Sequence, residues 1–192
     1  MNLIRFEDLG WLEEIVNYSL MGRVRGVSQD LYNRRIHKTV LYGMAILPTD
    51  NVIQLDFGMG GLIKRLATTV THGFVAGVDQ SHRMWEIARR RNERAIRSRR
   101  VDLRVCDPAL LPWEQGRFDK AIAINTYQSW PAPEDVLRGL RRVLRPGGAI
   151  LMTVRESSAK ALDVLKQSGF VNAQLIAQEG QEEILAAFRP TH

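Results

Sequence analysis

The sequence predicts an α/β fold: a doubly wound, mostly parallel sheet of seven strands whose last two strands form an antiparallel hairpin. From Asn51 onward, short apolar runs alternate with amphipathic stretches that are long enough to be helices. The last two apolar runs have no such stretch between them. Parallel neighbours need a long crossover, whereas antiparallel neighbours need only a short turn. This order therefore predicts a parallel sheet that ends in a hairpin.

Each element follows from its local pattern and from the residues that bound it. Apolar runs between turn residues predict the strands, and amphipathic segments predict the helices. Ser81 is placed to cap one helix, and Pro146, Gly147 and Gly148 stop another. Strands are expected at residues 52–55, 74–78, 101–105, 121–124, 149–154, 171–176 and 183–188, and helices at residues 62–70, 81–97, 133–144 and 158–168.

Before this alternation, residues 7–47 are predicted to be helical, with a break near Gly22 and Gly26. Pro48 then ends the helix and turns the chain. A chain of 192 residues is long enough for one good hydrophobic core and short for two. We therefore expect one compact domain overall, with residues 1–47 as a helical N-terminal segment and residues 48–192 carrying the sheet.

The composition is that of an ordinary globular protein, with 45% hydrophobic and 25% charged residues. Cys106 is the only cysteine, so neither an intrachain disulfide nor a cysteine-based zinc site can form. The four histidines show no metal-ligand spacing, and we expect no metal. No apolar stretch approaches the roughly 20 residues that span a bilayer, and the first residues lack the apolar core of a signal peptide. These features predict a cytoplasmic protein that does not enter a membrane.

Much of the net charge of +6 comes from one run of arginines. Contact with nucleic-acid phosphates is one interpretation of this run. A solvated helix end, where cations also suit the helix dipole, is the other. We favour the second because no aromatic residues interleave with the arginines, and we expect no nucleic-acid partner. The run comprises Arg89, Arg90, Arg91, Arg94, Arg97, Arg99 and Arg100, with Arg104 just beyond.

Ligands of doubly wound sheets bind at the carboxyl ends of the strands, where the strand order switches. The first predicted strand ends in a glycine-rich turn, in which Gly58 and Gly60 let the backbone approach a ligand. The second ends in Asp79, 19 residues after Gly60. An acid at this spacing commonly accepts hydrogen bonds from ribose hydroxyls, although it can instead cap a helix.

The third and fourth predicted strands also end in polar residues. Cys106 and Asp107 follow the third strand, where Asp107 can accept from the exocyclic amine of an adenine or form an ordinary Asp-Pro turn. Asn125, Tyr127 and Trp130 follow the fourth strand. The two aromatic rings can line an acceptor pocket, or they can pack beneath the loop, which is the more frequent arrangement.

Five motifs follow one another in a distinctive order: the glycine loop at residues 52–60, the strand and acid at residues 77–84, the fourth strand at residues 118–125, the turn at residues 142–148 and the Ser-Gly-Phe at residues 168–170. In this order residues 52–170 resemble the class I S-adenosylmethionine-dependent methyltransferases, which have a Rossmann-like fold. The resemblance is greatest to a small bacterial branch related to the quinone and sterol methyltransferases.

The resemblance implies S-adenosylmethionine as the cofactor. It implies that Gly58 and Gly60 approach the methionine part and that Asp79 binds the ribose. By the same resemblance Met84 packs near the adenine, Asp107 binds its amine and Asn125 lies near the methyl donor end. The remaining positions that it assigns to the cofactor site are Gln54, Asp56, Phe57, Gln80 and Cys106.

Two positions of the glycine loop differ from the pattern of this branch. The branch usually has an acid where Gln54 stands and a glycine where Asp56 stands. Gln54 can still form hydrogen bonds but carries no charge. Asp56 can pair with the ammonium group of the cofactor, or it can repel the carboxylate of the cofactor and occupy its space. The sequence leaves both alternatives open.

The function that this resemblance implies is in-line methyl transfer to a small-molecule acceptor. Residues 1–47 would form the lid of the acceptor pocket, which Tyr32, Asn33, Tyr127 and Trp130 would line. No catalytic residue is firmly assigned, and Tyr127 and His82 are the candidates for a base or an orienting group. Two alternatives remain: a related protein with a degenerate cofactor loop that acts as a non-catalytic partner subunit, and a basic methyltransferase of nucleic acids. A homodimer is compatible with the sequence.

Overall fold

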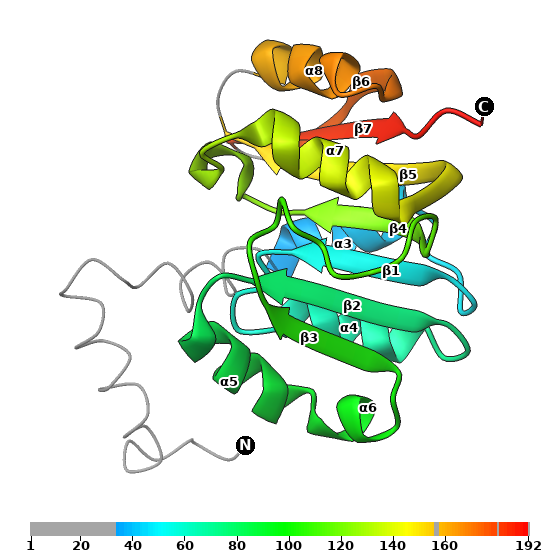
Figure 1. The fold of residues 1–192 in the computed structure, drawn as a ribbon, viewed down its shortest axis with the longest axis vertical. Coiled ribbons are helices and arrows are strands. Elements are labelled where there is room, and N and C mark those ends of the chain that lie inside the picture. The colour runs from blue at the N-terminus through cyan, green and yellow to red at the C-terminus, as the bar shows by residue number, and fades with distance from the viewer. Residues whose placement is uncertain (1–33, 156–157, 180, 192) are drawn as a thin grey trace, which may run out of the picture.

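The computed structural model describes residues 34–155, 158–179 and 181–191, and these residues form one seven-stranded sheet with helices on both faces (Figure 1). The strand order is β3-β2-β1-β4-β5-β7-β6. The strands are β1 (Asn51–Leu55), β2 (Phe74–Asp79), β3 (Val101–Val105), β4 (Phe118–Ala123), β5 (Leu144–Val154), β6 (Val171–Glu179) and β7 (Glu182–Phe188). The helices are α3 (Arg34–Gly43), α4 (Gly61–Thr69), α5 (His82–Arg91), α6 (Glu93–Arg97), α7 (Pro133–Val143) and α8 (Ser158–Gln167), with a 3-10 turn η2 (Tyr127–Ser129).

The predicted fold class is confirmed by the pairing of the strands. Strands β1 to β5 pair in parallel, whereas β7 is antiparallel to both β5 and β6. The order reverses between β1 and β4, because the chain winds outward from β1 to β3 and then crosses back to β4. This crossing places the loops that follow β1 and β4 side by side.

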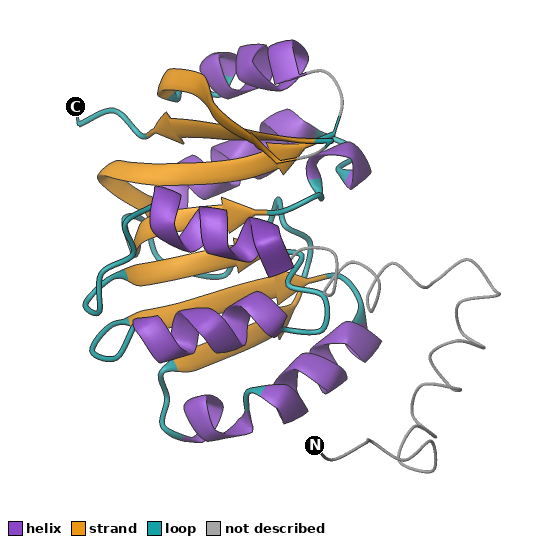
Figure 2. Cartoon of the chain, turned by 180° about the vertical axis from the view of Figure 1, so that it is seen from behind, coloured by secondary structure: helices purple, strands orange, loops and turns teal. Residues whose placement is uncertain are grey.

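Two apolar layers hold the helices on the sheet. On one face, α3 and α4 cover the strands, and Ile36, Val40, Leu62 and Leu66 are buried there (Figure 2). On the other face α7 and α8 pack through side chains that include Leu140. Burial of so many aliphatic side chains is the main favourable contribution to folding, at roughly 25 cal/mol for each Å² of apolar surface.

The crossover from β3 to β4 contains no helix. Two of its side chains cover the sheet instead: Leu111 is buried, and the ring of Trp113 packs edge-on against that of Phe118, with 5.6 Å between the ring centres. Arg142 of α7 holds this segment by donating to the backbone carbonyls of Leu111 at 2.5 Å and Trp113 at 2.7 Å. An irregular segment thus covers the sheet where a helix is usual in parallel crossovers.

One expected helix is divided, and strands β4 and β5 begin earlier than predicted, at Phe118 and Leu144. The helix expected over residues 81–97 is interrupted at Asn92, whose buried amide donates to the carbonyls of Gly60 at 3.2 Å and Ala88 at 2.8 Å. Strand β5 begins at Leu144, directly after α7, because Leu144 already pairs with Phe118. Gly147, in a left-handed conformation with φ 74°, therefore lies within an irregular start of this strand rather than in a separate turn.

The two edges of the sheet differ in character. Strand β3 forms one edge, and its exposed Arg104 is paired with Asp102 at 2.9 Å. Strand β6 forms the other edge and exposes Leu175 and Ile176 to 47% and 40%. Within the described ranges, each helix is too short or too polar to cross a membrane.

A buried ion pair fastens the start of β4 to the turn before β1. Lys120 Nζ lies 2.7 Å from Asp50 Oδ2, and it also donates to the carbonyl of Ala45 at 2.7 Å. The side chains of Lys120 and Asp50 are only 15% and 7% exposed. Removal of one partner would leave a buried charge uncompensated.

We predict that Lys120→Met lowers the free energy of unfolding by about 3 kcal/mol, because Asp50 then stays buried without its cation. The control is Arg97→Met, which breaks the exposed pair with Glu93 and should cost less than about 1 kcal/mol. Urea unfolding of both variants measures the difference. Equal losses in the two variants would contradict the prediction.

Candidate functional site

The candidate site lies at the carboxyl edge of the sheet, where β1, β2, β3 and β4 all end (Figure 1). Strand β1 lies between β2 and β4, so the loop after β1 is flanked by the loops that follow its two neighbours. This is the switch point of the sheet, where doubly wound folds bind ligands. The loops after β1 to β4 carry the polar residues that the sequence singled out.

In the loop after β1, every second residue from Asp56 to Gly60 has a left-handed backbone conformation. Asp56, Gly58 and Gly60 have φ angles of 47°, 54° and 71°. A Cβ on Gly58 would meet nothing within 4 Å, so this glycine borders open space that a ligand can enter. A Cβ on Gly60 would lie 2.7 Å from Ala88 Cβ and 2.7 Å from Asn92 Nδ2. Gly60 therefore serves the close packing of α4 against α5.

Asp79 ties the loops after β1 and β2 together. Its Oδ2 accepts from the backbone N–H of Gly58 at 2.8 Å, and its Oδ1 accepts from the backbone N–H of Ser81 at 2.9 Å. Burial raises the pKa of Asp79 from its ordinary value of 3.8 to about 6, the two hydrogen bonds oppose this rise, and the charge of Asp56 adds to it. The capping atom at the start of α5 is the Oγ of Ser81, which accepts from Met84 N at 3.3 Å.

Asp56 points toward the loop after β4. Its Oδ2 accepts from the hydroxyl of Thr126 and, at 3.1 Å, from the indole Nε1 of Trp130. Burial raises the pKa of Asp56, the bonds from Thr126 and Trp130 lower it, and the nearby charge of Asp107 raises it further. The side chain thus joins the glycine loop to the loop after β4.

Gln54 and Phe57 are both buried. Gln54 lies on β1 between Gly77 of β2 and Ile122 of β4, and its Oε1 has no hydrogen-bond partner in the described part of the chain. An orphaned buried oxygen is uncommon and marks a place where a ligand donor or a water fits. Phe57 packs under Gly77, where an added Cβ would lie 2.7 Å from Phe57 Cδ1.

The loop after β3 supplies two less buried groups. Cys106 is half-buried, and its backbone N–H donates to the carbonyl of Asp79 at 3.3 Å. Burial raises the pKa of its thiol, whereas the charge of Arg104 lowers it. Asp107 is exposed and accepts from the backbone N–H of Ala109 at 2.9 Å, which is the turn geometry of an Asp-Pro segment. Its carboxylate still faces the same edge as Asp56.

The loop after β4 begins with a left-handed residue and ends in buried aromatic rings. Asn125 has a φ of 54°, and its backbone N–H and Oδ1 both bond to the hydroxyl of Thr153, at 2.9 and 2.8 Å. Tyr127 and Trp130 are only 7% and 5% exposed and pack edge-on at 5.8 Å. Both rings therefore pack beneath the loop, the second of the two arrangements that the sequence allowed.

The other predicted residues lie at the margin of the site or outside it. Gln80 is exposed and Met84 is half-buried. His82 lies on the solvent side of α5, with its Nδ1 3.7 Å from Glu86 and its side chain 72% exposed. Burial raises the pKa of Tyr127. Tyr32 and Asn33 lie outside the described residues.

Sequence reasoning missed the residues that join the loops. Thr126 and Thr153 are buried hydroxyls that hold Asp56 and Asn125 in place. The sequence signal for Thr153 was a hydroxyl within an otherwise apolar predicted strand, whereas Thr126 stands in a polar stretch that does not distinguish it. Among the described residues, no three histidine, cysteine or acidic side chains gather as metal ligands would.

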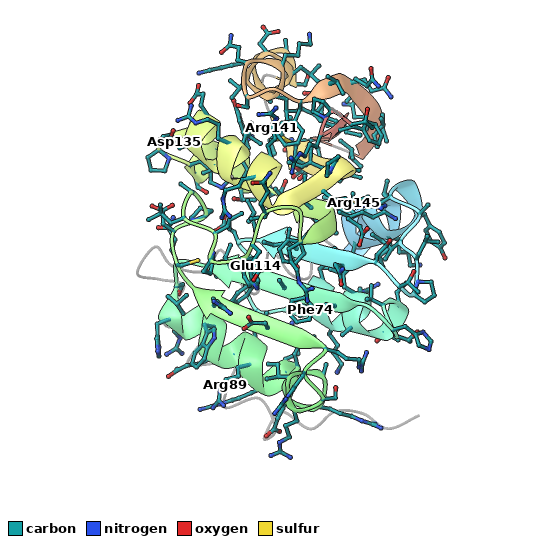
Figure 3. The ribbon with its side chains drawn as sticks, turned by 45° about the vertical axis from the view of Figure 1, so that its right-hand side comes forward. Phe74, Arg89, Glu114, Asp135, Arg141 and Arg145 are labelled. Atoms are coloured by element: carbon teal, nitrogen blue, oxygen red, sulfur yellow. The ribbon has the colours of Figure 1, made fainter. Side chains whose placement is uncertain are left out.

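Much of the arginine run is engaged within the protein. Arg100 donates to the carbonyls of Ala67 and Val70 at the end of α4, at 2.8 and 3.3 Å. Arg97 pairs with Glu93, and the guanidinium of Arg89 lies 5.4 Å from the centre of the Trp85 ring. Figure 3 shows Arg89 on α5, near the bottom of the view, and Arg141 on α7, in its upper part.

Comparison with known proteins agrees with this site. Residues 55–152, just over half of the chain, match the methyltransferase domain family, and the chain therefore belongs to this family. YdaC, an uncharacterized methyltransferase of Bacillus subtilis, is 26% identical over 129 residues, which cover 66% of this chain and 69% of that protein. A 2-phytyl-1,4-naphtoquinone methyltransferase of Synechococcus elongatus is 34% identical over 104 residues, 54% of this chain and 45% of that enzyme.

A protein of transposon TN4556 in Streptomyces fradiae is 35% identical over 120 residues, but the match covers only 34% of its length and 62% of this chain. The chain thus spans less than half of this relative and of the Synechococcus enzyme. A solved S-adenosylmethionine-dependent methyltransferase from Aquifex aeolicus superposes with a TM-score of 0.70 at 16% identity, over 79% of this chain and 87% of that one. At this identity the likeness shows a shared fold.

We predict that Gly60→Ala destabilises the protein by about 3 kcal/mol and Gly58→Ala by about 1 kcal/mol. Both residues are left-handed, so both variants carry the backbone cost. Only Gly60→Ala also forces a methyl group onto Ala88 and Asn92, which adds the cost of overpacking. Guanidinium unfolding measures both values. Similar losses would show that α4 and α5 can move apart freely.

We predict that Asp79→Asn changes how stability depends on pH. The folded protein holds the Asp79 proton more tightly than the unfolded chain does, so this contribution is present below pH 3.8 and is lost as the pH rises through about 6. The difference corresponds to about 3 kcal/mol. Relative to wild type, Asp79→Asn should therefore gain stability between about pH 4 and about pH 7.5, as measured by urea unfolding. A constant difference at all pH values would contradict this.

Proposed function

We propose that this protein transfers a methyl group from S-adenosylmethionine to a small-molecule acceptor. The observation that carries the proposal is the pairing of Asp79 with Gly58. The carboxylate of Asp79 holds the backbone of Gly58, and a Cβ on Gly58 would meet no other atom within 4 Å. This loop lies at the switch point of the sheet, where doubly wound folds bind ligands, in a chain of the methyltransferase domain family. Such a cradle admits a ligand that combines a ribose with an amino-acid end.

The donors and acceptors of the site fit this cofactor. Asp79 would accept from the ribose hydroxyls, and the loop at Gly58 would lie against the methionine part. The unpartnered Oε1 of Gln54 can accept one further donor. Asp107 would accept from the adenine amine, with Met84 beside the ring, and Asn125 would lie toward the methyl end. Gly60 would support this arrangement from the helix side, since its own space is closed by α5.

The chemistry that the cofactor supplies is an activated methyl group on a sulfonium. The protein then has to bind the acceptor, align it and exclude water. Neither of the two candidate bases is well placed to accept a proton: burial raises the pKa of Tyr127 and so keeps its hydroxyl protonated, and His82 is turned to solvent. This favours an acceptor that is already nucleophilic, or one that releases its proton to solvent. The hydroxyl of Thr153 would fix Asn125 at the methyl end.

The acceptor is proposed to be a small molecule because quinone methyltransferases are among the relatives of the chain. We further propose that residues 1–47 form the lid segment and residues 48–192 the cofactor-binding part. In support, α3 runs antiparallel to β1 and begins at the carboxyl edge where the site lies (Figure 1). The described part of the chain therefore starts at the edge where the site lies. We also propose a cytoplasmic setting.

A related protein that does not transfer methyl groups is the second candidate. Asp56 and Gln54 favour it, because neither is the residue usual in this branch. The cyclase SpnF has the same fold, with a TM-score of 0.71 at 19% identity over 82% of this chain, so the fold alone does not require methyl transfer. Against this candidate, the side chain of Asp56 is held by Thr126 and Trp130 rather than lying over Gly58.

The deciding measurement is calorimetric titration with S-adenosylmethionine and S-adenosylhomocysteine. We expect micromolar binding by the wild type and a loss of at least tenfold in Asp79→Ala, because the ribose partner and the anchor of Gly58 disappear together. The control is Asp102→Ala, which removes an acid of β3 that pairs with Arg104 instead. No binding by the wild type at millimolar ligand would overturn the proposal and favour the second candidate.

A further inference from the structure

Asp56 is an unusual residue for its place in the chain. It occupies a left-handed conformation with φ 47°. This conformation is unfavourable for every residue that has a Cβ atom, and glycine avoids the cost. Its carboxylate is also buried, which is costly for a charge. Two hydrogen bonds, from Thr126 and from Trp130, offset part of these costs. A strained, buried carboxylate at a ligand-binding edge points to a role in ligand binding.

The carboxylate of Asp56 lies near two other carboxylates at this edge, those of Asp79 and Asp107. The charge of Asp107 raises the pKa of Asp56, and the charge of Asp56 raises the pKa of Asp79, so Asp56 is repelled by both of the other acids. Within the described part of the chain, none of the three is bonded to lysine or arginine; their partners are backbone N–H groups, a hydroxyl and an indole. A positively charged ligand would lower this electrostatic free energy, whereas a neutral ligand would not.

Asp56 differs from the other two acids in the loop that its carboxylate contacts. Asp79 accepts hydrogen bonds from the loops after β1 and β2, and Asp107 accepts one within its own turn. Asp56 alone bridges from the glycine loop to the loop after β4, which is the acceptor side of the proposed site. A methyl donor has to present its sulfur to the acceptor, so this is the side on which the charge of the sulfur matters.

We propose that Asp56 is a specificity-determining residue that makes the site bind the sulfonium form of the cofactor in preference to the neutral thioether product. The proposal rests on the proposed function. Methyl transfer breaks the bond between sulfur and the methyl carbon, the electron pair of that bond stays on sulfur, and the acceptor forms the new bond to carbon. S-adenosylhomocysteine therefore lacks the positive charge that Asp56 attracts, and it leaves the site more readily.

The test compares three ligands by calorimetry at pH 8: S-adenosylmethionine, S-adenosylhomocysteine and sinefungin, which carries an amine-bearing carbon in place of the sulfonium. We expect Asp56→Asn to weaken S-adenosylmethionine and sinefungin at least tenfold and S-adenosylhomocysteine less than threefold, because opposite charges at close range interact strongly in a partly buried site. Asparagine keeps an oxygen for the bonds from Thr126 and Trp130. Asp56→Gly removes the same charge without the backbone cost and should give the same pattern.

Two controls separate charge from structure. Thr126→Val removes a hydrogen bond to Asp56 but keeps the charge, so it should change the affinities of all three ligands by the same factor. The NMR signal of the Trp130 indole N–H, assigned with Trp130→Phe, reports whether the loop after β4 is intact in each variant. Equal weakening of all ligands in Asp56→Asn would overturn this inference alone. Absence of binding by the wild type would instead overturn the cofactor assignment and this inference with it.

Discussion

The hydrogen bonds to the carboxylate of Asp79 organise the ligand-binding edge of this protein. The backbone N–H of Gly58 and that of Ser81 converge on one side chain, so the loop after β1 and the start of α5 are held by the same group. The position of the glycine loop then determines where Asp56 lies and where α4 begins. Gly60, the last residue before α4, is in turn held by Asn92 from the end of α5. A single buried acid thus holds together the loops after β1 and β2, from which α4 and α5 begin.

The ligand-binding edge carries the acids Asp56, Asp79 and Asp107, although the protein as a whole has a net charge of +6. Burial raises the pKa of both Asp56 and Asp79, which means that folding works against their ionisation. Sites that bind ligands commonly retain such unfavourable groups, because the ligand supplies the missing partner. The arginines contribute no direct compensation here, since several are engaged with α4 carbonyls, Glu93 and Trp85 on the far side of α5. Within the described residues, no lysine or arginine bonds to Asp56 or Asp79, so a positively charged ligand would be their first cationic partner.

The sequence was a good guide to elements and a poor one to contacts. The alternation from Asn51 onward and the missing helix before the last strand correctly predict the parallel sheet and its hairpin, because both depend only on local periodicity. The division of the helix at Asn92 could not be predicted, since its cause is a bond to Gly60, far away in the chain. The same holds for Thr126 and Thr153, whose partners Asp56 and Asn125 lie in the loops that follow β1 and β4. Asp79 could be singled out from the sequence because it ends the second predicted strand, 19 residues after Gly60, and the carboxyl ends of parallel strands meet at one edge of the sheet.

The unequal edges of the sheet have a consequence for how copies of this chain meet during folding. Strand β3 presents Arg104 and lies beside the arginine-rich α5 and α6, so a second copy approaching this edge meets like charge. Strand β6 presents Leu175 and Ile176 and carries no lysine or arginine, although the register of its pairing with β7 shifts at two places. Unpaired backbone groups beside apolar side chains are a template for strand addition. In concentrated refolding mixtures, intermolecular β-pairing should therefore begin at strand β6. The substitution Ile176→Lys, which adds a charge to this edge, should suppress it.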